Sequence, residues 1–209
     1  MTNYHYWQYF LSLETDLITT SRFIEFSGVD DVNIVNNGNT FSTELLRIFF
    51  ISCAECENIL KILATRINLS TNPRVNIKQL RDIIMNSDYR TLSNQIISCP
   101  AYNLDLKPWY KWNIPNNSPQ WWTDHNTLKH GRSNDNNSNY HLANLSNTLN
   151  SVAALMCLLY EYYKKEINDN EGEYSVSIPT VLAPKLFIPK VSGLGFGNEN
   201  WVWQPQSQL

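Results

Sequence analysis

The sequence predicts an all-α fold, a helical bundle of residues 1–168 followed by a short, partly extended C-terminal arm of residues 169–209. Two observations lead to this prediction. Apolar residues recur every three or four positions through most of the first 165 residues, which is the spacing of a buried helix face. Beyond that point the pattern changes to short alternating or β-branched runs broken by prolines and glycines, which is typical of short strands.

The apolar spacing predicts the individual helices of the bundle. They cover residues 6–25, 42 to between 68 and 73, about 77–85, about 89–98, 118 to about 130, and about 139–165. The second has the widest apolar face, and Ser42 can cap it, so it should lie centrally. Pro100 should end helical structure and Pro119 should begin the next helix, because proline fits the first turn of a helix and not its interior. Gly131 is expected to end that helix in a left-handed conformation.

The sequence makes separate structural predictions for two further segments. Trp109, Tyr110 and Trp112 lie in the irregular stretch 101–118, where large aromatic side chains favour a lid over the core rather than a platform for a ligand. The arm should form short strands near residues 174–178, 185–188 and 201–203.

Composition limits the possible functions. Hydrophobic residues make up 43% of the chain and charged residues 17%, which supports a substantial core and argues against disorder. The net charge of -3 provides no overall basic field, so nucleic-acid binding would need a local patch. Neither a signal-peptide pattern nor an apolar run of the roughly 18–20 residues that span a bilayer is present. A cytoplasmic protein without a membrane partner is expected.

The cysteines leave two alternatives. Cys53-x-x-Cys56 could be half of a zinc site or a redox pair. Cys99 and Cys157 offer no matching spacing, so buried free thiols that behave as small hydrophobic side chains are favoured.

The side chains best suited to chemistry lie at the end of the fifth predicted helix. A neutral imidazole such as that of His130 can take the proton of a ribose 2′-hydroxyl. Lys129 or Arg132 can stabilise charge developing on a phosphate, and Asn126 can orient the histidine or a phosphate oxygen. His125 is a helix neighbour of Lys129. The candidate catalytic residues are His130, Asn126, Lys129, Arg132 and His125.

Aromatic residues around this group could bind RNA bases. Trp121, Trp122 and Tyr140 are the candidates for stacking on unpaired bases. Packing of the tryptophan pair against the core is the structural alternative.

A metal site is the third possibility for the same segment. Asp124, His125, His130 and His141 could ligate zinc. His125 and His130 are not spaced as the i, i+4 pair that places two ligands of one metal on one helix face, so neither a metal nor a cofactor is expected.

The candidate residues follow the pattern W-x-x-H-N-x-x-K-H-x-R from Trp122 to Arg132. This pattern, with the helix that follows it, resembles the HEPN superfamily of helical-bundle proteins. More narrowly, it resembles a bacterial branch with a W-x-x-Y-N-x-x-K-H-x-R core. Supporting segments include Phe41-Ser42-Thr43-Glu44-Leu45 and Pro108-Trp109-Tyr110-Lys111-Trp112, and the similarity covers roughly residues 5–165.

The resemblance implies a HEPN-like up-and-down bundle that acts as a metal-independent endoribonuclease in bacterial toxin–antitoxin or antiviral defence systems. A homodimer would form the site, and an antitoxin or defence protein would be a partner. His130 matches the catalytic histidine and Asn126 the polar residue of the superfamily motif. His125 stands where the superfamily has an arginine that holds the scissile phosphate. Either Lys129 and Arg132 replace that arginine, or the protein binds RNA without cutting it.

A non-catalytic interaction module is the alternative function. The same helix end would then form a dimer or partner surface, or bind a nucleotide, nucleic acid or protein partner. A buried His130 bonded to Glu44 or Glu55 would indicate a structural role. A two-fold contact bringing two His130 side chains into one cleft would indicate an enzyme.

Overall fold

The computed structural model describes residues 4–27, 33, 35–67, 76–131, 139–166, 174–190, 194–196 and 200–203. The α-helices in these ranges are α1 (His5–Thr20), α2 (Thr43–Ile67), α3 (Ile77–Met85), α4 (Gln120–Gly131) and α5 (Leu145–Tyr163). Short 3-10 helices are η1 (Asp88–Asn94), η2 (Pro100–Tyr102), η3 (Asn139–Leu142) and η4 (Thr180–Leu182).

Two small antiparallel sheets accompany the helices. One has the order β2-β1-β5, from β1 (Ile97–Cys99), β2 (Leu104–Leu106) and β5 (Ile188–Pro189). The other has the order β3-β4-β7-β6, from β3 (Lys165–Glu166), β4 (Tyr174–Pro179), β6 (Leu194–Phe196) and β7 (Asn200–Trp203). The protein is therefore mostly helical, as predicted, but the all-α class is corrected by these sheets.

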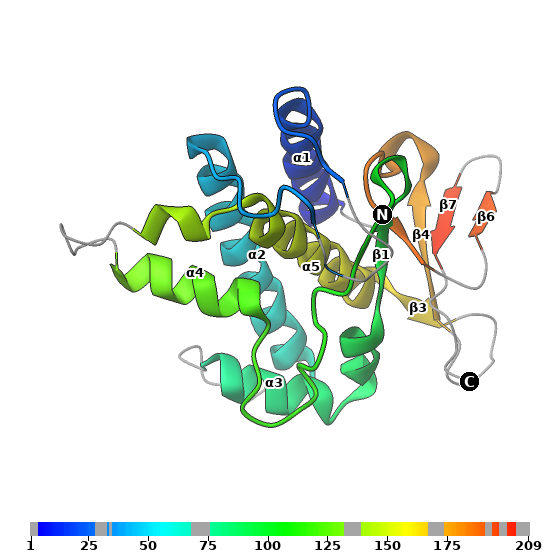
Figure 1. Cartoon of the computed structure of the whole chain (residues 1–209). Helices are drawn as coiled ribbons and strands as arrows, with labels where there is room; N and C mark the ends of the chain where they lie inside the picture. The colour runs from blue at the N-terminus through cyan, green and yellow to red at the C-terminus, as the bar shows by residue number, and fades with distance from the viewer. Residues whose placement is uncertain are drawn as a thin grey trace.

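Helix α5 forms the centre of the core. Figure 1 shows it crossing the middle of the molecule, with α1 above, α3 below, α4 on the left and the strands on the right. All but two of its 19 residues are buried. It packs on α2 through small side chains, and the hydroxyls of Ser52 and Ser151 lie 2.6 Å apart at the crossing. Its burial on every side explains why residues 152–160 are all apolar.

Polar caps set the starts of the long helices. The Ser42 hydroxyl accepts a hydrogen bond from the Leu45 amide at 3.1 Å, which confirms the predicted cap of α2. The Asn144 side chain accepts one from the Asn147 amide at 2.9 Å. This cap starts α5 at Leu145, so the helix predicted from about residue 139 is divided into η3 and α5.

The helix predicted over residues 89–98 is wrong. Residues 88–94 form η1, and Ile97 and Cys99 then point into the core from strand β1. Pro100 begins η2 rather than ending helical structure. The strand forms because β1 pairs with β2 on one side and with β5, from distant sequence, on the other.

Gly131 ends α4 without the predicted left-handed conformation. It is the last helical residue, and its φ lies outside the positive range. A Cβ atom at this position would lie 2.7 Å from Asn139 Nδ2, so the glycine permits the close approach of η3 to α4.

The segment leading into β5 is docked on α1. The Trp7 indole N–H donates to the Leu182 carbonyl at 2.8 Å. The Glu14 carboxylate, 2% exposed, accepts from the backbone amides of Lys185, Leu186 and Phe187 at 2.8–3.0 Å. Burial raises the Glu14 pKa, while the three amide bonds oppose that shift. This part of the predicted arm therefore belongs to the core.

Two other predictions concern the cysteines and membrane-spanning helices. All four cysteines are free and buried, and burial raises the pKa of each thiol, so the prediction of buried free thiols is confirmed. None of the helices in the described ranges combines the length and hydrophobicity needed to cross a bilayer.

Candidate functional site

Helix α4 has one face in the core and one in solvent. Trp121, Trp122, His125 and Leu128 are buried, whereas Lys129 and His130 are exposed. The buried residues recur every three or four positions, which places them on a single helix face. The predicted site is therefore divided between the protein interior and its surface.

Hydrogen bonds hold α4 against its neighbours. The Asp124 carboxylate accepts from the Gln120 and Asn147 side-chain amides, each at 2.8 Å, and Asn147 belongs to α5. The Trp121 indole N–H donates to the Pro108 carbonyl at 2.8 Å. These bonds fix the first half of the helix, so its C-terminal end is presented from a rigid base.

His125 is part of the core and is 4% exposed. Its ring lies edge-on against Phe49 and Phe50 of α2, with centroids 5.9 and 5.3 Å away. Desolvation, and then the charge of Lys129, lower the His125 pKa to about 4. The ring is consequently neutral near pH 7. The position that the resemblance assigns to a phosphate-holding arginine is an uncharged side chain inside the protein.

The tryptophan pair is also buried, with Trp121 3% and Trp122 4% exposed. These indoles present no open ring face to an RNA base, so the proposed stacking role is corrected in favour of core packing. Tyr140 of η3 remains 40% exposed. Trp109 and Trp112 cover the core as expected of a lid, whereas Tyr110 between them points outward and is 51% exposed.

The exposed end of α4 carries Lys129 and His130, here called the α4 tip. Neither side chain makes a hydrogen bond or ion pair with another residue in the described ranges. Both lie in the last helical turn, where the helix dipole favours positive charge. Asn126, one turn earlier, is partly exposed. Arg132 lies outside the described residues.

Glu57, whose charge interacts with Lys129, and Glu44, considered above as a partner of His130, both belong to other interactions. The Lys61 ammonium pairs with Glu57 at 2.6 Å and, together with the charge of Lys129, keeps the Glu57 pKa low. Glu44 pairs with Arg47. His130 is exposed, and within the described ranges it makes no hydrogen bond or ion pair with Glu44 or Glu55, so the condition stated for a structural role is not met.

The zinc alternative is not supported by the geometry. Within the described ranges, no three His, Cys, Asp or Glu side chains gather closely enough to hold a metal ion. Asp124 faces two amides instead, and His125 is turned into the core.

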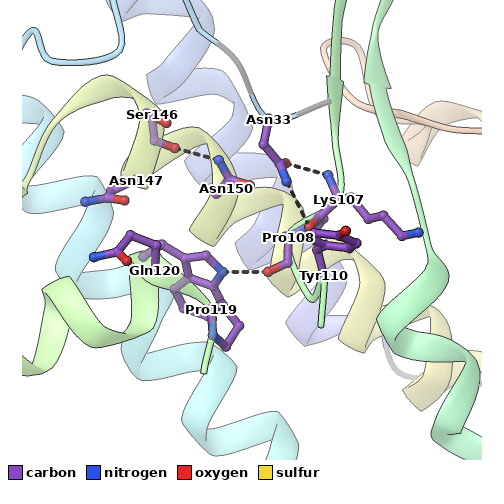
Figure 2. Close-up of a pocket in the computed structure, with 10 residues that line it drawn as sticks. Asn33, Lys107, Pro108, Tyr110, Pro119, Gln120, Ser146, Asn147 and Asn150 are labelled. Atoms are coloured by element: carbon purple, nitrogen blue, oxygen red, sulfur yellow. Dashed lines mark hydrogen bonds between the residues drawn. The ribbon is translucent and has the colours of Figure 1, made fainter. Parts of the chain in front are cut away.

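Sequence reasoning missed a cavity at the other end of α4. Its volume is about 330 Å³, and Figure 2 shows it between the start of α4, helix α5 and the turn after β2. Its polar lining includes Asn33, Lys107, Gln120, Asn147 and Asn150. The available signal was the pair Asn147 and Asn150, three residues apart in the polar first half of a helix whose second half is largely apolar.

Comparisons with protein-family models, with curated proteins and with solved structures found no match to this chain.

Proposed function

We propose that this chain is a HEPN-like RNA-binding protein of a bacterial defence or toxin–antitoxin system, and that the α4 tip contacts the RNA backbone. The observation that carries the proposal is the exposed pair Lys129 and His130 at the end of a helix whose other face is anchored in the core. Phosphate contacts by cations supply most of the affinity in RNA and DNA binding, so an unpaired cation at a fixed position suits this role.

Cleavage of the bound RNA is the second candidate function. His130 would take the proton of a ribose 2′-hydroxyl, and the 2′-oxygen would attack the adjacent phosphorus. The bond from phosphorus to the 5′-oxygen would break, leaving a 2′,3′-cyclic phosphate, and the 5′-oxygen would take a proton from water. Lys129 would stabilise the phosphate charge. The exposed imidazole of His130 supports this candidate.

The environment of His125 favours binding over cleavage. A neutral, buried ring cannot hold the scissile phosphate as the superfamily arginine does. The charge must come from Lys129, with Arg132 as the further candidate in the motif. We therefore place RNA binding first and make cleavage a separate outcome of the tests.

An RNA-binding titration over a range of salt concentrations tests the first function. Lys129→Ala should weaken binding to a labelled single-stranded RNA and reduce the slope of log affinity against log salt by about 0.7. Lys78→Ala, an exposed lysine on α3, is the matched control. Equal binding by the two variants would refute the assignment of the α4 tip.

A cleavage assay tests the second function. If the chain cuts RNA, His130→Ala should abolish the cyclic-phosphate product while leaving the melting temperature unchanged. His5→Ala, an exposed histidine on α1, should leave cleavage intact. Cleavage that survives His130→Ala would exclude this mechanism.

We further propose that the chain works as a homodimer, as the HEPN resemblance implies, with an antitoxin or defence protein as its cellular partner. Sedimentation equilibrium of the purified chain measures the first part directly. A monomer at tens of micromolar would contradict it.

A further inference from the structure

The loop between β2 and α4, residues 107–119, combines positive charge with exposed apolar side chains. Its sequence contains Lys107 and Lys111 but no acidic residue, within a chain whose net charge is -3. Tyr110 is 51% and Ile114 47% exposed, and Lys111 is exposed as well. These four side chains are here called the Tyr110 surface.

Buried tryptophans on either side of Tyr110 hold this loop to the core. Trp109 is 0% and Trp112 1% exposed. The Trp109 indole N–H donates to a backbone carbonyl of α5 at 3.2 Å. Further along the loop, the Arg81 guanidinium of α3 donates to the Ile114 carbonyl at 3.2 Å. The Tyr110 surface is therefore held in a fixed shape, so a partner that binds it loses little free energy to ordering the loop.

Both lysines lie over the tyrosine ring and do not pair with an acid. The ammonium groups of Lys107 and Lys111 are 5.4 and 4.9 Å from the centre of the Tyr110 ring, and Figure 2 shows the Lys107 side chain extending beside that ring. Neither ammonium makes an ion pair or hydrogen bond with another residue in the described ranges. Asp105, two residues before Lys107, pairs with Lys190 instead. The positive charge of the Tyr110 surface is therefore available to a partner.

The backbone of Lys111 is left-handed, with a φ of 60°. A long side chain is strained in this conformation, whereas glycine and asparagine adopt it more readily. Among the described residues other than glycine, the remaining positive-φ positions are all asparagines: Asn33, Asn103 and Asn116. Strain of this kind tends to occur where a side chain contacts a ligand. It is a second observation that indicates a binding role for the Lys111 side chain.

The make-up of the Tyr110 surface favours a protein partner over RNA. Two lysines neutralise about two phosphates, whereas nucleic-acid-binding surfaces usually contact several more. Both ammonium groups lie over the Tyr110 ring, which leaves less of its face open to a stacked base. The exposed Ile114 offers an apolar contact, and tyrosine is enriched in the cores of protein–protein interfaces.

We propose that the Tyr110 surface binds an acidic segment of a partner protein, whose carboxylates pair with Lys107 and Lys111 and whose apolar side chains pack on Tyr110 and Ile114. Because the chain as a whole is acidic, the local positive charge gives such a segment its specificity for this surface. The inference does not depend on RNA binding at the α4 tip. Only the cellular identity of the partner rests on the function proposed above.

Fluorescence anisotropy of the whole chain with a labelled synthetic peptide tests the proposal. In the probe, aspartate and glutamate alternate with leucine. One control peptide has asparagine and glutamine at the acidic positions, and a second keeps the acids but has serine in place of leucine. The acidic, leucine-containing peptide should bind at least several-fold more tightly than either control, with an affinity that falls as salt rises. No binding of this peptide at millimolar concentration, or equal binding of the neutral peptide, would overturn the proposal.

Variants locate the binding surface. Replacing Lys107 and Lys111 together by glutamine should weaken peptide binding about tenfold, because each exposed charge pair contributes a few-fold in affinity. Tyr110→Ala should weaken it to a similar extent, as the loss of an aromatic anchor does. Lys78→Gln, an exposed lysine on α3, is the matched control and should bind as wild type does. Unchanged peptide binding by the lysine double variant would refute the assignment.

Lys111→Asn separates binding from folding. Asparagine tolerates the left-handed backbone and removes the charge, so the melting temperature should not fall while the peptide affinity falls a few-fold. A lower melting temperature with unchanged peptide affinity would assign Lys111 a structural role and contradict the proposal.

The α4 tip provides an internal comparison. Lys129→Ala should leave peptide binding unchanged, and the Lys107 and Lys111 double variant should leave binding of a single-stranded RNA unchanged. Failure of the RNA-binding proposal therefore does not alter the result expected with the peptide. RNA binding that requires Lys107 and Lys111, without binding of the acidic peptide, would assign the Tyr110 surface to RNA and overturn the inference.

Discussion

Removal of the Glu14 carboxylate should release the segment before β5 from α1. Glu14 accepts hydrogen bonds from the backbone amides of Lys185, Leu186 and Phe187, and the last two amides are buried. In Glu14→Ala these amides lose their acceptor. Each buried donor left unpaired costs about 1–3 kcal/mol, so the two buried amides together cost about 2–6 kcal/mol. For a chain of this size the melting temperature should fall by on the order of 10 °C.

The variant Glu14→Gln removes the negative charge of the side chain but keeps one hydrogen-bond acceptor. Glutamine keeps one oxygen, and the Glu14 Oε1 atom is the one that accepts from all three amides. Its loss of stability should therefore be smaller than that of Glu14→Ala. Thermal and urea unfolding measure both variants, with Glu25→Ala, an exposed residue after α1, as control.

Hydrogen exchange shows where the loss occurs. In Glu14→Ala the amides of Leu186 and Phe187 should exchange faster, while the amides of α5 should be less affected, because the docked segment can open locally. The reasoning is refuted if Glu14→Ala is no less stable than Glu25→Ala, or if exchange at the docked segment is unchanged.

Three further predictions concern buried polar groups. Burial raises the Glu161 pKa to about 7. As the pH rises from about 4.5 to 7, the wild type should therefore lose stability relative to Glu161→Gln. A stability difference in urea unfolding that stays constant over this pH range would contradict the prediction. The low His125 pKa gives the opposite pH dependence of stability. As the pH falls from about 6.5 to 4, the wild type should lose stability relative to His125→Phe, as measured by urea unfolding. Trp121→Phe should be about 1 kcal/mol less stable than Trp122→Phe, because the Trp121 indole donates to Pro108 and the Trp122 indole N–H has no partner among the described residues. Equal melting temperatures of the two tryptophan variants would contradict the last prediction.

The long helices could be predicted because each repeats its apolar spacing over many turns. Ser42 marked the start of α2 because a serine at this position can cap a helix, and the structure contains that capping bond. Residues 89–98 could not be assigned in the same way. A short apolar run fits a helix or a strand, and its conformation depends on pairing with β5, which lies about ninety residues later in the chain.

The candidate site was predicted in part for a similar reason. The position of Lys129 and His130 at a helix end followed from local sequence. The burial of His125 did not, because it depends on Phe49 and Phe50 from another helix. The bond from the Asn147 amide to Asp124 did not follow from local sequence either, because it is also a contact between helices.

The burial of the four cysteines has a practical consequence for spectroscopy. The thiolate is the reactive form of cysteine, and every native thiol is both covered and held protonated. A cysteine introduced at an exposed position, for example Lys78→Cys, should therefore take up a maleimide dye alone in the folded protein. The native chain can serve as its own unlabelled background, and a single dye per protomer would test the proposed dimer by measuring the distance between two dyes.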